Sequence, residues 1–160
     1  MSRSPFAAAG LIAIAAVPAA TQAPDSASFV TRLGADTIAV ERLVRTPTRV
    51  EAIVVLRIPQ TTMTHYVMEL SAAGEWIRME SATAGGTSHD VVRRERVTRD
   101  GDSLRVETTT DQGTREQSVA AASDVLPFID MVHWPYEVAL MRVSEGSASN
   151  ATIPALRSAK

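Results

Sequence analysis

The stretch MTHYVMELSAAGEWIRMESA, residues 63–82, decides the fold. Its two halves, 63–70 and 76–82, are strand-like runs, and Tyr66, Met68 and Leu70 share one face of the first. The connector 71–75 is short and contains Gly74, which suits a tight reversal of the chain. Short connections favour antiparallel neighbours, because parallel strands need a crossover of a dozen residues or more. The stretch therefore predicts an antiparallel hairpin.

The same pattern continues on both sides of this hairpin. Further strand-like runs cover 29–33, 37–45, 50–58, 91–99, 103–110 and 114–119. Turn signals separate them, most clearly Asp100-Gly101-Asp102, because an Asp-Gly step tolerates positive φ. We expect a mainly β protein: an antiparallel β-meander of about eight strands, forming a curved sheet or a partial barrel. Apolar residues on both faces of 50–58 predict a central strand that is nearly buried on both faces.

The pattern changes after residue 124. Pro135 suits the first turn of a helix, and Glu137 and Arg142 lie near the ends that the helix dipole favours for their charges. We expect a helix at 135–144, packed across the sheet. Residues 151–156 again resemble the start of a strand. A strand so near the last residue suggests a chain truncated at its C-terminus, with a frayed end as the alternative.

The first 23 residues are typical of an export signal. Arg3 precedes an apolar run from Phe6 to Val17, and small residues follow Pro18. This run is too short for a bilayer, which needs about 20 residues. We expect a signal peptide at 1–23, cleaved after Ala19 or Ala23, and one β-rich domain at 24–160 that is secreted or periplasmic. No later run is long enough to span a membrane.

Composition excludes several kinds of function. The chain has no cysteine, so disulfides, thiol catalysis and cysteine metal sites are absent. Its 16 basic residues are outnumbered by 18 acidic ones, whereas nucleic-acid binders usually carry a strong basic excess. All basic residues except Lys160 are arginine, which we interpret as codon bias, with an anion-binding surface as the alternative.

No motif for catalysis is visible. His65, His89 and His133 do not form a metal-binding spacing, and the chain contains no serine-hydrolase elbow and no phosphate loop. The charges at 90–107 mix both signs across one hairpin, as on a solvated sheet face. We therefore expect a protein without catalytic residues, metal ions or cofactors.

Large apolar side chains offer the best candidate binding site. Tyr66 and Met68 share one strand face, Trp76 lies on the next strand, and Trp134 and Tyr136 lie at the expected helix. A curved sheet covered by a helix can enclose a cavity for an apolar ligand. The alternative is that these five residues fill the core.

Residues 25–42, DSASFVTRLGADTIAVER, resemble the opening of uncharacterised secreted bacterial β-rich proteins, and the likeness extends through Leu126-Pro127-Phe128 and the following helix. Those relatives are longer, and no activity is attached to them. The architecture is also similar to that of periplasmic lipoprotein carriers, whose curved sheet and helices surround an apolar cavity. Such a likeness implies a fold and not a function.

These observations lead to three functional hypotheses. The first is an exported, non-enzymatic binding or accessory domain for an apolar small molecule or lipid. The second is a structural or protein-interaction module that binds a protein partner at an open sheet edge. The third is a hydrolase with a dispersed site, which would require a histidine to meet a carboxylate or hydroxyl. The sequence identifies neither the ligand nor the oligomeric state.

Overall fold

The computed structural model describes residues 24–86, 90–121, 125–126, 129 and 131–144. The expected signal peptide, His89, Pro127-Phe128 and the strand expected at 151–156 lie outside these residues.

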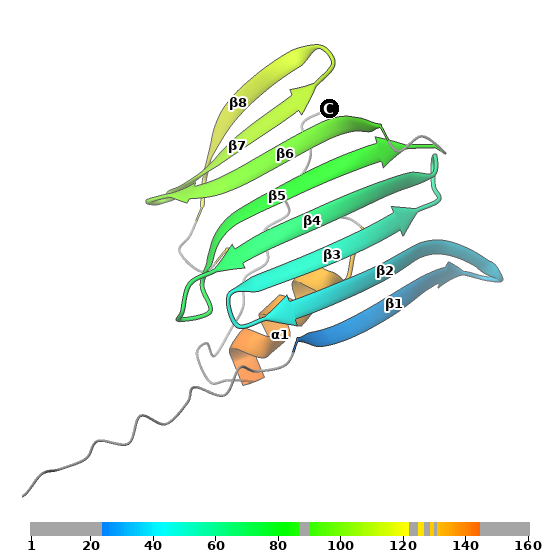
Figure 1. The fold of residues 1–160 in the computed structure, drawn as a ribbon, viewed down its shortest axis with the longest axis horizontal. Helices are drawn as coiled ribbons and strands as arrows, with labels where there is room; N and C mark the ends of the chain where they lie inside the picture. The colour runs from blue at the N-terminus through cyan, green and yellow to red at the C-terminus, as the bar shows by residue number, and fades with distance from the viewer. Residues whose placement is uncertain (1–23, 87–89, 122–124, 127–128, 130, 145–160) are drawn as a thin grey trace, which may run out of the picture.

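The described chain forms one eight-stranded sheet and one helix (Figure 1). Neighbours in sequence are neighbours in the sheet, in the order β1 to β8, and all pairs are antiparallel. The predicted meander is therefore confirmed, and the sheet is not closed into a barrel. The elements are β1 (Asp25–Leu33), β2 (Asp36–Thr46), β3 (Arg49–Leu56), β4 (Thr62–Leu70), β5 (Trp76–Gly85), β6 (Val91–Asp100), β7 (Ser103–Thr110), β8 (Gly113–Ala120) and α1 (Trp134–Ser144).

The turns explain why these strands pair with their neighbours. Gly101 joins β6 to β7 with a φ of 58°, and Gly74 lies between β4 and β5 with a φ of 76°. Glycine reaches this left-handed region without the steric cost that a Cβ imposes. Both hairpins therefore close where the sequence predicted.

The two faces of the sheet differ sharply. We call inner the face whose side chains pack toward α1, and outer the opposite face. Side chains at alternate positions point to the same face, so β4 buries Tyr66, Met68 and Leu70 on the inner face and directs His65 and Val67 outward. The core formed on the inner face is Leu43, Val50, Ala52, Val54, Tyr66, Met68, Leu70, Trp76, Met79, Val97, Leu104, Val106, Val125, Leu126, Val132, Trp134, Val138 and Ala139.

α1 and the residues before it cover part of the inner face. The Trp134 ring contacts the Tyr66 ring on β4, with centroids 5.5 Å apart, and His133 stacks on Phe29 of β1 at 5.9 Å. Figure 1 shows α1 near the β1–β3 side of the sheet, away from β7 and β8. The expected helix is therefore present and packs on the sheet.

The prediction that 50–58 is buried on both faces was wrong. β3 lies inside the sheet between β2 and β4, but its outer residue Ile53 is 47% exposed. Two neighbouring strands complete the hydrogen bonds of β3, and among the described residues only those on the inner face form a covering layer. An apolar run shows that its side chains are suited to burial. Burial of both faces also requires a covering layer on each face, and the run itself does not supply one.

Both edges of the sheet are open within the described residues. β1 and β8 each have one pairing partner, and every residue of β8 is exposed. In the part of the chain that the structure describes, no helix has the length and apolar character needed to cross a membrane.

Candidate functional site

The five residues predicted to bind an apolar ligand divide into two groups. Tyr66, Met68, Trp76 and Trp134 belong to one core cluster, and none is more than 8% exposed. Tyr136 is 41% exposed and lies outside that cluster. The four clustered residues pack with the apolar side chains of the sheet and with Val125, Leu126, Val132, Val138 and Ala139. Their role in ligand binding stays a prediction.

Trp76 attaches the 125–126 segment to the sheet. Its indole Nε1–H donates to the carbonyl oxygen of Val125. The Arg99 guanidinium lies over the Trp76 ring, 5.1 Å from the centroid, and also donates to the Val125 carbonyl at 3.3 Å. The Trp134 indole nitrogen, by contrast, is buried and has no hydrogen-bond partner among the described residues.

Burial raises the pKa of Tyr66 to about 12, from an ordinary value of 10. Removing its hydroxyl from water is the main cause, the charges of Glu95 and Glu41 add to it, and a hydrogen bond with Thr64 opposes it. The neutral phenol is therefore favoured in the folded protein. The resulting contribution to stability is complete below pH 10 and is lost as the pH rises toward 12.

We expect an alkaline titration of tyrosine absorbance to show a step near pH 12 that is absent from Tyr66→Phe. The Tyr136→Phe variant, which alters the exposed ring, is the matched control and should retain that step. A wild-type titration without ionisation near pH 12 would contradict the burial of this hydroxyl.

A buried carboxylate joins the sheet to the start of α1. Glu41 on β2 is 1% exposed, and its oxygens accept the His133 backbone N–H at 2.8 and 3.0 Å and the Trp134 N–H at 3.2 Å. His133 Nδ1 lies 2.7 Å from the same carboxylate. Because a carboxylate can only accept a hydrogen bond, His133 Nδ1 must donate and therefore carries a proton. Nε2 is the other nitrogen of the ring. Thr31 Oγ1 is 3.4 Å from Nδ1.

This arrangement resembles the histidine–carboxylate part of a hydrolase site. Its hydrogen bonds, however, point to anchoring: two backbone N–H groups at the helix start use the carboxylate, as in helix capping. The Thr31 hydroxyl contacts Nδ1, the nitrogen already bonded to Glu41, and not Nε2. We therefore interpret Glu41 and His133 as a structural anchor.

Sequence reasoning missed Glu41. A signal was present, because Glu41 occupies an inner position between Ala39 and Leu43 on the same strand face, where a charge needs a buried partner. The partner lies 92 residues away in sequence, so only the fold shows it.

The three histidines do not converge in the described structure. His65 lies on the outer face and His133 at the inner-face anchor, while His89 is outside the described residues. Within the described ranges, no group of three potential metal ligands is found.

The outer face carries a row of apolar side chains across six strands. In the strand register, one apolar residue on each strand from β1 to β6 lies directly opposite the next. We call these residues the apolar row: Val30, Val40, Val55, Met63, Ala84 and Val91. Four of these residues are 40–57% exposed. Six strands at about 4.8 Å spacing give a row roughly 24 Å long. Val55 is half-buried and Ala84 is 5% exposed, so the exposure of the row is interrupted at these two positions. Exposed apolar groups gathered on one face are typical of an interaction surface.

A row of cations runs beside the apolar row. This row lies two residues from the apolar row along β2 to β5 and three residues from it along β6, where the register shifts. Its aligned members are Arg42, Ile53, His65, Ala82, Arg94 and, on β7, Thr109. No member of this cationic row is a carboxylate, but the Glu51 carboxylate on the same face lies 3.8 Å from His65 Nε2. Arg42 and Arg94 are exposed and form no ion pair with any described residue.

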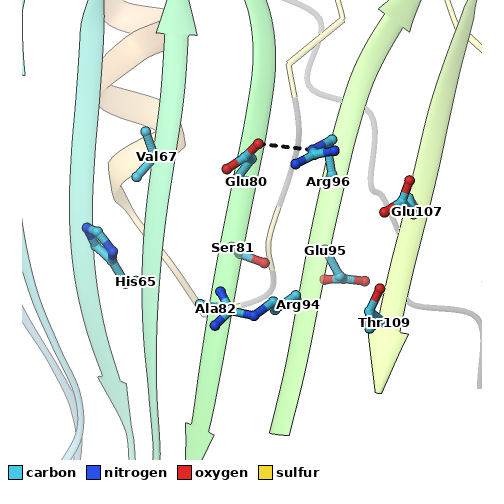
Figure 2. A pocket seen from close by; sticks show the side chains of 10 residues that line it. All are labelled: His65, Val67, Glu80, Ser81, Ala82, Arg94, Glu95, Arg96, Glu107 and Thr109. Atoms are coloured by element: carbon cyan, nitrogen blue, oxygen red, sulfur yellow. Dashed lines mark hydrogen bonds and ion pairs between the residues drawn. The ribbon is translucent and has the colours of Figure 1, made fainter. Parts of the chain in front are cut away.

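A depression lies beside this row on the outer face (Figure 2). Its volume is about 240 Å³, below the roughly 300–1,000 Å³ of pockets for whole drug-sized ligands. Figure 2 shows the Arg94 side chain extending from β6 across Ala82 of β5, on the side where His65 lies. The small Ala82 side chain leaves room for this arrangement. The depression is lined by His65, Val67, Glu80, Ser81, Ala82, Arg94, Glu95, Arg96, Glu107 and Thr109.

The carboxylates around the depression differ in their partners. Glu80 on the outer face pairs with Arg96 at 2.9 Å and with Arg78 at 3.6 Å. Glu95 lies opposite Ser81, which pairs with Tyr66, so its side chain is on the inner face, where it pairs with Arg93 at 2.5 Å. Glu107 forms no ion pair among the described residues. One guanidinium, that of Arg94, and one carboxylate, that of Glu107, are therefore left to interact with a bound group. Sequence reasoning interpreted these charges as a solvated face, because pairing along the strands is invisible without the register.

A scan of protein-family models, a search of curated proteins and a search of solved structures each found no match to this chain.

Proposed function

We propose that this protein is an exported, non-enzymatic binding domain that holds a phospholipid on the outer face of its sheet. The apolar row contacts an acyl chain, and the cationic row binds the phosphate through Arg94 and His65. The observation that carries the proposal is the adjacency of an exposed apolar row to a row with unpaired guanidiniums and no carboxylate.

The dimensions of the two rows suit such a ligand. The apolar row, roughly 24 Å long, is longer than one acyl layer, which is half of the roughly 30 Å bilayer core, so a single acyl chain can lie along part of it. The depression has room for a headgroup and not for a whole lipid. Rows two residues apart along a strand lie about 7 Å from each other, so one molecule can reach both.

The charges favour a particular headgroup. Arg94 offers a planar guanidinium, which matches phosphate oxygens in geometry and charge. Glu107 lies in the same depression and can accept from an ammonium group. We therefore expect phosphatidylethanolamine, which carries both groups, to bind more tightly than a lipid without phosphate.

The test is binding of the purified protein to vesicles containing phosphatidylethanolamine and phosphatidylglycerol, measured by co-sedimentation. Arg94→Ala should weaken binding about fivefold, because one cation near a lipid surface contributes about 1 kcal/mol. Arg105→Ala is the matched control: Arg105 is exposed on the same face but is paired with Asp100 and Glu116. It should leave binding unchanged.

Two further arms separate the sources of affinity. Met63→Ser should also weaken binding, because it places a hydroxyl within the apolar row. Vesicles of a glycolipid without phosphate should bind less, and the Arg94 effect should disappear on them. Equal binding of wild type, Arg94→Ala and Met63→Ser would reject the outer face as the lipid site.

A further inference from the structure

β1 is an open edge with few charges. Residues 26–31, Ser-Ala-Ser-Phe-Val-Thr, are all uncharged, and within the described residues only β2 pairs with this strand. Val30 is 57% exposed and Leu33 is 68% exposed. An edge strand with unpaired backbone groups and exposed aliphatic residues is a template for a further strand.

We propose that a second copy of this chain pairs with β1 through its own β1, antiparallel, about a two-fold axis at Val30. Directly opposite residues in an antiparallel pair share a face, so such an axis must pass through a residue and not between two. An axis at Val30 sets the two Val30 side chains against each other. It also sets Ser28 against Arg32 of the second copy, and Ala27 against Leu33.

This register covers the exposed residues of the edge. Val30 and Leu33 each gain an apolar neighbour, and Arg32 meets a serine rather than another charge. A shift of the axis to Phe29 would instead set the apolar Leu33 against Asp25. Charge and apolar pairing therefore both favour Val30 as the axis.

The opposite edge of the sheet is unsuited to the same contact. β8 carries Arg115 and Glu116 in its centre. An axis at Glu116 would bring two carboxylates together, and an axis at Gln117 would place Arg115 against Val119. Charged residues of this kind protect natural edge strands from pairing. The difference between the edges selects β1.

Pairing at β1 has a consequence for the outer face. The apolar row begins at Val30, so the dimer joins the apolar rows of two copies into one. The dimer does not depend on lipid binding, and it can be tested in the absence of lipid.

A charge at residue 28 tests the register by its sign. In the proposed dimer, residue 28 of each copy faces Arg32 of the other, so the two-fold axis produces this contact twice. We expect Ser28→Glu to lower the dimer dissociation constant about fivefold and Ser28→Lys to raise it about fivefold, measured by sedimentation velocity. Ser118→Glu and Ser118→Lys on β8 are the controls and should change nothing. Unfolding is measured in parallel, because Ser28 also lies opposite Arg42 of its own chain.

A cysteine at the axis gives a second, independent reading. The natural chain has no cysteine, so a single engineered one reports a single contact. Val30→Cys should form an intermolecular disulfide under mild oxidation, and Gln117→Cys on β8 should remain monomeric. A wild-type protein that stays monomeric at all soluble concentrations would overturn the proposal. So would equal dimerisation of the glutamate and lysine variants, or cross-linking through residue 117 instead of residue 30.

Discussion

Replacing Trp76 by alanine is expected to lower the free energy of unfolding by about 4 kcal/mol, the largest effect of any single substitution considered for this chain. Trp76 is 1% exposed at the centre of the core, and removing a buried aromatic side chain costs roughly 3–5 kcal/mol. The substitution also removes the donor to Val125 and the ring beneath Arg99. The 125–126 segment would then lose a principal attachment to the sheet.

The next residue provides a matched control for this prediction. Ile77 follows Trp76 on β5 and is 48% exposed, so Ile77→Ala should change stability by less than about 0.5 kcal/mol. Trp76→Phe should have an intermediate effect, because it keeps a ring but removes the indole N–H. Urea denaturation followed by circular dichroism measures all three variants. A loss for Trp76→Ala no greater than that for Ile77→Ala would contradict the proposed core.

Replacing Glu41 by alanine is expected to lower the free energy of unfolding by about 3 kcal/mol. The variant leaves the N–H groups of His133 and Trp134 without their acceptor at the start of α1. An unsatisfied buried polar group costs about 1–3 kcal/mol, and two are created here. The inner-face cover should loosen as a result, with increased amide exchange at the start of α1.

Glu51→Ala is the matched control for Glu41→Ala. Glu51 lies on the outer face of β3, with 43% of its side chain exposed, and its partners are Arg49 and His65. Surface ion pairs contribute about 0–1 kcal/mol, so this variant should remain close to wild type. Glu41→Gln keeps one carbonyl oxygen as an acceptor and should lose less than Glu41→Ala. Equal stability of Glu41→Ala and Glu51→Ala would show that the anchor does not hold the helix.

The local architecture followed from sequence because its contacts are local. Gly74 and Gly101 mark hairpins in which each strand pairs with the next one along the chain. Alternation then assigns Tyr66 and Met68 to one face. A meander contains no crossover that a sequence pattern could conceal, so strand order could be predicted together with the strands.

Contacts between distant residues could not be predicted. Glu41 needed His133, and no pattern in β2 indicates which later residue would approach it. The apolar row depends on register across five strand pairs, and residues such as Val40 and Met63 have no signal in common along the chain. Ile53 shows the same difficulty, since its exposure depends on the absence of a second layer among the described residues and not on its own type.

Two surfaces remain after the inner face has been assigned to the core. The outer face carries the apolar and cationic rows, and the β1 edge carries unpaired backbone groups. They meet at Val30, which belongs to both. A dimer at β1 would therefore extend the surface proposed to bind lipid without altering the contacts within either copy.

The most direct test of the lipid-binding proposal places an environment-sensitive fluorophore on the outer apolar row. A Met63→Cys variant labelled with a nitrobenzoxadiazole dye is mixed with phosphatidylethanolamine–phosphatidylglycerol vesicles, beside a control labelled at Gln117→Cys on β8. We predict a blue shift and an intensity increase at residue 63, and no change at residue 117. An unchanged spectrum at residue 63, or a response at residue 117 alone, would contradict the claim that the outer apolar row meets the lipid.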